Sequence, residues 1–153
     1  MDATEHVLLL VEDNPDHAEL VLRCLEAQPI RHRVVHLVDG EATLAYLTHR
    51  PPFDAEASAP TPHLVLLDLR LPKVDGLDVL RAVKTAPDLR KIPIVVLTSS
   101  AAESDVTGAY AAHANSYLVK PLDSDRLERM LQDVGRYWLG WNRPPDPAAG
   151  GRG

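Results

Sequence analysis

Four apolar, strand-like runs in this chain each end in polar residue types that phosphoryl transfer requires. The runs and the polar residues after them are Val7–Val11 with Glu12 and Asp13, Leu64–Leu67 with Asp68, Ile94–Leu97 with Thr98 and Ser99, and Ser116–Val119 with Lys120 and Pro121. Because the carboxyl ends of parallel strands lie along one edge of a sheet, where open α/β sheets bind ligands, we expect these residues to meet. The sequence therefore predicts one site with three carboxylates, a hydroxyl group and an ammonium group.

The three acids, Glu12, Asp13 and Asp68, predict a divalent cation. Like charges within a few ångströms repel and cost folding free energy unless a cation joins them. An all-oxygen site with few protein ligands suits Mg²⁺ or Mn²⁺, which also take phosphate oxygens as ligands. An aspartate beside such an ion can attack phosphorus, while Lys120 and Thr98 neutralise and bind the phosphoryl oxygens. These residue types are typical of a phosphoryl-transfer site.

The elements that must position these residues alternate between strand and helix. Helices are predicted to begin near Asn14–Pro15, Asp39–Gly40, Gly76, Ser104 and Ser124, the last one running to Trp138, and a further strand is predicted at Arg33–Val38. Nearly uninterrupted Val, Leu and Ile in the strands indicate a parallel sheet covered on both faces. We therefore predict a flavodoxin-like (βα)5 fold, an α/β doubly wound parallel sheet with strand order 2-1-3-4-5. The Pro- and Ala-rich stretch 51–62 predicts a long surface loop.

Length and composition agree with one ordinary soluble domain. The chain has 153 residues, of which 45% are hydrophobic and 25% charged, and a formal net charge of −6 that argues against a nucleic-acid partner. No apolar run reaches the roughly 18 residues of a membrane span. With its single cysteine, Cys24, the chain is expected to be cytoplasmic, with no DNA and no membrane among its partners. Residues 5–139 are predicted to form the domain and the Pro- and Gly-rich residues 140–153 a disordered tail.

The ordered set of strand ends resembles the receiver domain of two-component response regulators over about residues 5–138. The matching segments are Val11–Asn14, Leu67–Gly76, Val96–Ser99 and Tyr117–Pro121. The resemblance implies that Asp68 is the phosphoacceptor and takes a phosphoryl group from a phosphohistidine of a sensor histidine kinase. With no output domain attached, the output would be a protein–protein contact or a phosphorelay.

The same resemblance implies a role for each residue of the site. Asp13, Asp68 and the backbone carbonyl of Arg70 would ligate Mg²⁺, and Glu12 would reach it through water. Lys120 would pair with the phosphoryl group and Thr98 would bond to it, with Ser99 as the neighbouring alternative hydroxyl. Tyr117 would be the aromatic residue that changes rotamer on activation, although a strand aromatic equally suits plain packing. The Lys120–Pro121 peptide is expected to be cis.

A closer resemblance is to the small single-domain regulators that are paired with bacterial phytochromes. It rests on the pattern Tyr110-x-x-His113-x-Asn115-x-Tyr117, on the long loop before Asp68, and on the aromatic segment Tyr137–Leu139. His113 stands where many receivers have Gly, and His tolerates a left-handed helix cap better than most residues. This resemblance implies a sensor kinase of the phytochrome type.

An aromatic cluster of Tyr137, Trp138 and Trp141 stands out in a chain with few aromatic residues. Exposed rings at the end of the last helix favour a partner surface, and we predict a homodimer through the last strand and the last two helices. The alternative is that the rings fold back onto the flank of the sheet. The seven histidines show no metal-binding spacing and are assigned surface or packing roles.

Three other functions are weighed against the switch. A phosphatase with an Asp nucleophile needs a general acid two positions later, where this chain has Arg70, which cannot donate a proton near neutral pH. A Rossmann-type nucleotide site needs a Gly-rich loop after the first strand, where this chain has Glu12-Asp13-Asn14-Pro15. A receiver-like scaffold that is never phosphorylated remains open at this point.

Overall fold

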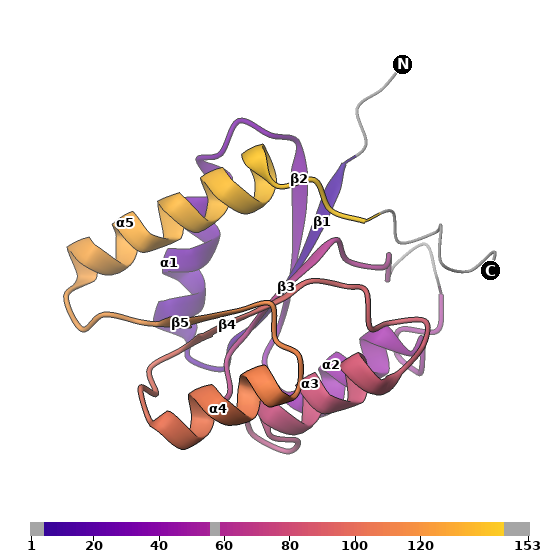
Figure 1. Cartoon of the computed structure of the whole chain (residues 1–153). Coiled ribbons are helices and arrows are strands. Elements are labelled where there is room, and N and C mark those ends of the chain that lie inside the picture. Colours follow the sequence, from indigo (N-terminus) through magenta and orange to yellow (C-terminus); the bar gives the residue numbers. More distant parts are fainter. Residues whose placement is uncertain (1–4, 56–58, 146–153) are drawn as a thin grey trace.

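The structure, a computed structural model, describes residues 5–55 and 59–145 and alternates strands with helices along the chain (Figure 1). The elements are β1 (His6–Val11), α1 (Pro15–Glu26), β2 (His32–Leu37), α2 (Gly40–Leu47), β3 (Leu64–Leu67), α3 (Gly76–Thr85), β4 (Ile94–Thr98), α4 (Glu103–Ala111), β5 (Ser116–Val119) and α5 (Ser124–Gly135). All neighbouring strands pair in parallel, in the order β2-β1-β3-β4-β5. The predicted flavodoxin-like fold is confirmed.

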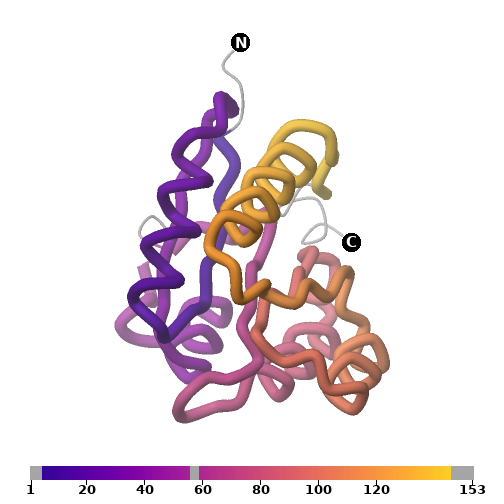
Figure 2. The backbone as a smooth tube through the Cα atoms, turned by 90° about the vertical axis from the view of Figure 1, so that its left-hand side faces the viewer, coloured from indigo at the N-terminus to yellow at the C-terminus, as the bar shows by residue number. Residues whose placement is uncertain are grey.

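Helices cover both faces of the sheet (Figure 1), and a hydrophobic layer on each face holds the fold together. Side chains of a strand alternate between faces, so Leu8 and Leu10 point to one layer and Leu9 and Val11 to the other. The first layer packs against α1 and α5, which lie side by side in Figure 2. The second packs against α2, α3 and α4. Burial on both faces explains the continuous apolar strands.

The strand register brings the four predicted strand ends to one edge. Val11 pairs with Leu67, Leu67 pairs with Val96, and Thr98 pairs with Val119. The next residues along β1, β3 and β5 are Glu12, Asp68 and Lys120. Backbone pairing therefore brings these residues to the same edge of the sheet, and the long Lys120 side chain reaches across from β5 to Glu12 at the end of β1.

Helices α1, α2 and α5 begin where a capping side chain accepts from their first N–H groups. The Asn14 side chain accepts from the backbone N–H of Asp16 at 2.9 Å and of His17 at 3.2 Å, and Pro15 occupies the first helical position of α1. Asp39 caps α2 by accepting from Ala42 N–H at 2.7 Å. The Asn14 cap fixes the first turn of α1 just after the end of β1.

The C-terminal segment differs from its prediction. Helix α5 ends at Gly135, and a π-helical turn over Arg136–Trp141 follows, so residues 140 and 141 belong to a helical turn. Buried Leu139 anchors this turn to the layer under α1 and α5. The part of the predicted disordered tail from residue 146 onward lies outside the described residues, as do residues 1–4 and 56–58.

The long loop before β3 is anchored to α2. Phe53 packs edge-on against Tyr46, with ring centroids 5.3 Å apart, and the Tyr46 hydroxyl donates to the carbonyl of Pro60 at 2.7 Å.

None of the described helices is long and apolar enough to cross a membrane.

Candidate functional site

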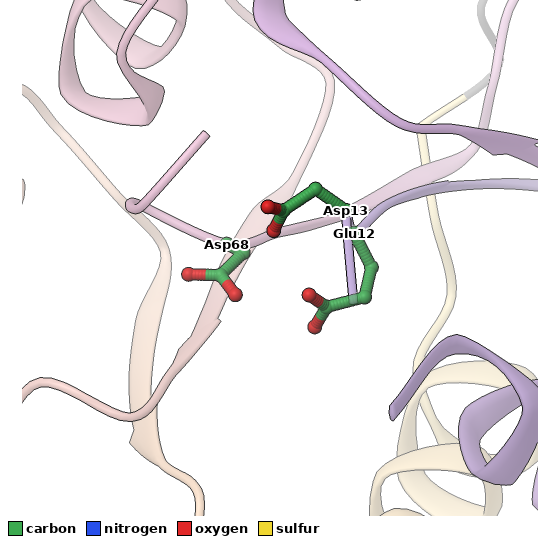
Figure 3. A group of neighbouring side chains, drawn as sticks. All are labelled: Glu12, Asp13 and Asp68. Atoms are coloured by element: carbon green, nitrogen blue, oxygen red, sulfur yellow. The ribbon is translucent and has the colours of Figure 1, made fainter. Parts of the chain in front are cut away.

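Three carboxyl groups gather at the carboxyl edge of the sheet, as the sequence predicts (Figure 3). Glu12, Asp13 and Asp68 each offer an oxygen, and these oxygens all lie within 4.8 Å of one another. Glu12 and Asp68 are buried, whereas Asp13 is exposed. The cluster can therefore be reached by a metal ion from the side of Asp13.

The Lys120 ammonium lies among these acids and is itself buried. It donates to Glu12 Oε1 and, at 3.2 Å, to Asp68 Oδ2. In a nearly dry environment such an ion pair is favourable only if the geometry is good and the other polar atoms are also bonded. One ammonium group faces three carboxylates, so the cluster keeps an excess of negative charge.

The Asp68 carboxylate is held by several donors. Oδ1 accepts from the hydroxyl of Thr98 at 2.9 Å and from the backbone N–H of Arg70 at 3.0 Å, and Oδ2 accepts from Lys120. A Cβ at Gly76 would lie 2.3 Å from the Asp68 carbonyl, so only glycine allows α3 to begin this close to β3. Close packing at Gly76 therefore fixes the backbone at Asp68, and the three donors orient its carboxylate.

The two candidate hydroxyls beyond β4 differ in position. Thr98 is completely buried and bonded to Asp68, whereas Ser99 is exposed. The geometry favours Thr98 as the hydroxyl that acts on Asp68.

Glu12 is the acid most affected by burial. Desolvation raises the pKa of Glu12, and the hydrogen bond and charge of Lys120 oppose that rise. Its Oε1 accepts from Lys120 and its Oε2 from the backbone N–H of Asn14 at 3.1 Å. Because both oxygens already have donors, Glu12 is suited to reach a cation through water.

The expected cis peptide at Lys120–Pro121 is wrong. Among the described residues the cis peptide bond is Pro51–Pro52, and Lys120–Pro121 is trans. The backbone N–H of Lys120 donates to the carbonyl of Thr98 at 2.8 Å, which fixes the lysine at the end of β5. Its ammonium reaches both acids from there, and trans is the commoner form of an X–Pro bond.

A second set of contacts links the site to α4. The Arg70 guanidinium pairs with Asp105 of α4, and the same carboxylate accepts from the hydroxyl of Ser100. The Tyr117 hydroxyl donates to the Ser100 carbonyl at 2.9 Å, and partial burial raises the pKa of Tyr117. The loops after β3 and β4 are thus both joined to one α4 residue.

Two groups at the site were missed by sequence reasoning. His17, assigned a surface or packing role, has its Nδ1 3.1 Å from Lys120 Nζ. Asp105 received no role. Both lie in the first turn of a helix that begins just after a strand end, and this position is the signal that sequence reasoning could have used. His113 has φ 71° after the end of α4, as expected for a left-handed helix cap.

The donor set fits a hard divalent cation. Carboxylate oxygens are the ligands that Mg²⁺ and Mn²⁺ prefer, and their excess negative charge over Lys120 is what such an ion would neutralise. Asp68 Oδ1 accepts two hydrogen bonds and Oδ2 accepts one, so one lone pair of the carboxylate, on Oδ2, is left for a cation. The exposed Asp13 carboxylate leaves that side open to the waters that Mg²⁺ retains.

Comparison with known proteins gives a consistent result. The family model of the response regulator receiver domain matches residues 8–132. FilR2 of Methanothrix harundinacea, described as a probable methanogenesis regulatory protein, is 47% identical over 93% of this chain and 89% of its own. Response regulator Rcp1 of Synechocystis sp. is 42% identical over 87% of this chain and 88% of its own.

Solved structures are similar over nearly the full length. The Mn²⁺-bound form of Rcp1 has a TM-score of 0.89 at 40% identity, covering 92% of this chain and 99% of Rcp1. The phosphorylated cyanobacterial phytochrome response regulator RcpA has a TM-score of 0.88 at 35% identity, covering 94% of this chain and 100% of RcpA.

Proposed function

This chain belongs to the response regulator receiver family, and on that premise we propose that Asp68 receives a phosphoryl group from a sensor histidine kinase. One observation carries the proposal: the Asp68 carboxylate is buried at the carboxyl edge of the sheet and bonded to both Thr98 and Lys120. A carboxylate that only capped a helix or faced solvent would not be expected to bond to both a buried hydroxyl and a buried ammonium.

In the proposed transfer a carboxylate oxygen of Asp68 forms a bond to phosphorus. The phosphorus–nitrogen bond to the kinase histidine breaks, and the imidazole leaves with the electron pair. The Lys120 ammonium is close enough to Asp68 to pair with the negative charge of the arriving phosphoryl group. The Thr98 hydroxyl can turn away from Asp68 and donate to a phosphoryl oxygen. A divalent cation held by Asp13, Asp68 and the Arg70 carbonyl, with Glu12 through water, would neutralise phosphoryl oxygens.

The signal would then travel through the loop after β4. A shift of Thr98 toward the phosphoryl group displaces the Ser100 carbonyl, to which the Tyr117 hydroxyl is bonded. Tyr117 would lose that partner and change rotamer, which alters the surface of α4 and β5. This is how the site would control a partner without catalysing turnover.

We infer a switch rather than an enzyme that turns over a substrate. The residue in the general-acid position of an aspartate phosphatase, Arg70, directs its guanidinium to Asp105 of α4. An always-charged arginine cannot supply the proton that a leaving alcohol needs. We also propose a cytoplasmic protein that does not bind DNA, in keeping with the net charge of −6.

The proposed kinase is of the phytochrome type. Support comes from the similarity to RcpA, whose description names a phytochrome. FilR2, described as a probable methanogenesis regulatory protein, is also similar, so family similarity alone does not name the kinase. Phosphotransfer from a phytochrome-type sensor kinase should therefore be much faster than from an unrelated kinase, and equal rates would contradict the assignment.

We further propose a homodimer through α4, β5 and α5. Tyr110, Val119 and Leu122 are exposed apolar residues there, and Leu122 is fully exposed. Of the aromatic cluster, Trp138 packs against the core while Trp141 is 81% exposed. Sedimentation at tens of micromolar, with and without the phosphoryl mimic beryllofluoride, should show a dimer; a monomer in both states would remove this proposal.

Acetyl phosphate tests the phosphoacceptor directly. With Mg²⁺ the wild-type protein should gain the mass of one phosphoryl group, which is stable in acid and lost in base. The Asp68→Asn variant should gain none. An unchanged wild-type mass would contradict the switch and favour the unphosphorylated scaffold.

A further inference from the structure

A histidine completes the hydrogen bonding of the site lysine. His17 Nδ1 lies 3.1 Å from Lys120 Nζ, next to the bonds from the same ammonium to Glu12 and Asp68. A lysine ammonium has three donors and no acceptor. The three donors therefore have three acceptors, which come from the end of β1, the end of β3 and the first turn of α1.

This contact fixes the protonation state of the imidazole. Since Lys120 can only donate, His17 Nδ1 must carry the lone pair, and the ring proton then sits on Nε2. A proton on Nδ1 would face the ammonium, remove the acceptor and add a like charge. The contact thus exists only with neutral His17.

The backbone of His17 is held in place independently of the lysine. Its N–H donates to the capping side chain of Asn14 at 3.2 Å, in a helix turn that begins at Pro15. The His17 side chain is half-buried. The imidazole is therefore a fixed point on α1, whereas the Glu12 and Asp68 acceptors carry charges that change on metal binding and phosphorylation.

We propose that His17 is a positioning residue that holds the Lys120 ammonium at the phosphoacceptor. Without it, one donor of a buried ammonium loses its partner, and the lysine is drawn closer to the more buried Glu12. With it, the ammonium stays between Glu12 and Asp68, within reach of oxygens that arrive on phosphorus. The inference rests on the proposed function of Asp68, because it concerns the same transfer.

Two substitutions separate positioning from structure. His17→Asn keeps an oxygen acceptor near the position of Nδ1, and His17→Leu removes the acceptor. The readout is the initial rate of phosphorylation by acetyl phosphate with saturating Mg²⁺ at pH 7.5. His32→Asn is the matched control, since His32 lies at the other end of the sheet and its Nδ1 contacts the Ile30 carbonyl.

At pH 7.5 the Asn variant should keep the wild-type rate, and the Leu variant should be about tenfold slower because the lysine is misplaced. Rescue by Asn, which restores only the acceptor, distinguishes positioning of the lysine from plain packing, and His32→Asn should keep the wild-type rate.

A Leu variant as fast as wild type, or an Asn variant as slow as the Leu variant, overturns the positioning role. Thermal melts and Mg²⁺ titrations of each variant identify any that fail to fold, and if the Leu variant does, an Asn variant slower than the wild type still overturns the role. If the wild type itself takes no phosphoryl group, the proposed function fails instead, so the two failures are distinguishable.

Discussion

Two charged regions flank Asp68, and they differ in their exposure to water. In the first, Lys120 joins Glu12 and Asp68 with side chains that are 3%, 2% and 9% exposed. In the second, Arg70 reaches from the next loop to Asp105, with side chains 63% and 20% exposed. Both contain ion pairs, but only the first excludes solvent.

This difference in exposure indicates that the two regions have different roles. Charges in a dry environment interact strongly and cannot be exchanged cheaply for water, which suits the stabilisation of charge on a phosphoryl group. An exposed pair is weak and screened by salt, so it can open and close at little cost. We therefore expect chemistry to depend on the buried cluster and signal transmission to pass through the Arg70–Asp105 side.

The largest predicted effect is on the buried lysine. Lys120→Met should lower the free energy of unfolding by about 3 kcal/mol near pH 7.5, because it leaves buried carboxylates without their cation. Lys73→Met is the matched control, since Lys73 is exposed and lies 3.8 Å from Asp39; it should cost less than about 1 kcal/mol. Urea denaturation measures both, and similar losses would mean that the two regions do not differ.

The pH dependence of that loss follows from Glu12. Burial raises the pKa of Glu12 and Lys120 lowers it, so removing the lysine raises it further. A carboxyl group with a raised folded-state pKa lowers the free energy of unfolding only at pH values where it must be ionised. The stability lost in Lys120→Met should therefore shrink as pH falls toward 5 and Glu12 is protonated. A deficit that grows in acid would contradict the assigned charge state.

The next largest effect on stability is expected at the buried hydroxyl of Thr98. Thr98→Ala removes a hydrogen bond to a charged acceptor and should destabilise the protein by about 2 kcal/mol, whereas Thr98→Ser should restore most of it. Ser99→Ala, at the exposed neighbour, should change stability very little. Thermal or urea unfolding measures both changes. Equal effects at the two positions would contradict the choice of Thr98 over Ser99 as the hydroxyl that acts on Asp68.

A smaller effect of opposite sign is expected from the excess negative charge. Asp68→Asn should stabilise the protein by about 1 kcal/mol without metal, because it relieves repulsion with Glu12 and Asp13 while keeping an oxygen for Thr98. Mg²⁺ should raise the melting temperature of the wild type by mass action, and that of the variant less. The exposed Asp88→Asn serves as control, and a destabilised Asp68→Asn protein would refute the repulsion argument.

The smallest effect is expected at the exposed pair. A double-mutant cycle of Arg70→Ala and Asp105→Ala should give a coupling free energy of about 0.5 kcal/mol that falls in high salt. Coupling between Glu12 and Lys120 should be larger and insensitive to salt. If the exposed pair proves the stronger of the two, the division between the regions is wrong.

Much of the fold follows from local sequence rules. Continuous apolar strands, caps such as Asn14 and Asp39, and apolar residues at helical spacing predict the alternation of elements, and parallel pairing then aligns the strand ends. The extension of helical structure to Trp141 was not predictable, because it depends on Leu139 packing against distant helices.

The site was predictable at strand ends and less so elsewhere. Glu12, Asp68, Thr98 and Lys120 follow strands whose register the fold dictates. His17 and Asp105 act through side-chain directions from helices, which depend on how each helix is set against the sheet. The trans peptide before Pro121 is a further departure from what the sequence led us to expect.

Locating the phosphoryl group tests the central claim most directly. Protein treated with acetyl phosphate and Mg²⁺ is reduced with borohydride, which converts a phosphorylated aspartate to homoserine, and the peptides are mapped by mass. Homoserine should be found at position 68, and Lys120→Met should greatly reduce its yield. Homoserine at Asp13 or at another acid, or none in a folded protein that binds Mg²⁺, would contradict the assignment of Asp68 as phosphoacceptor.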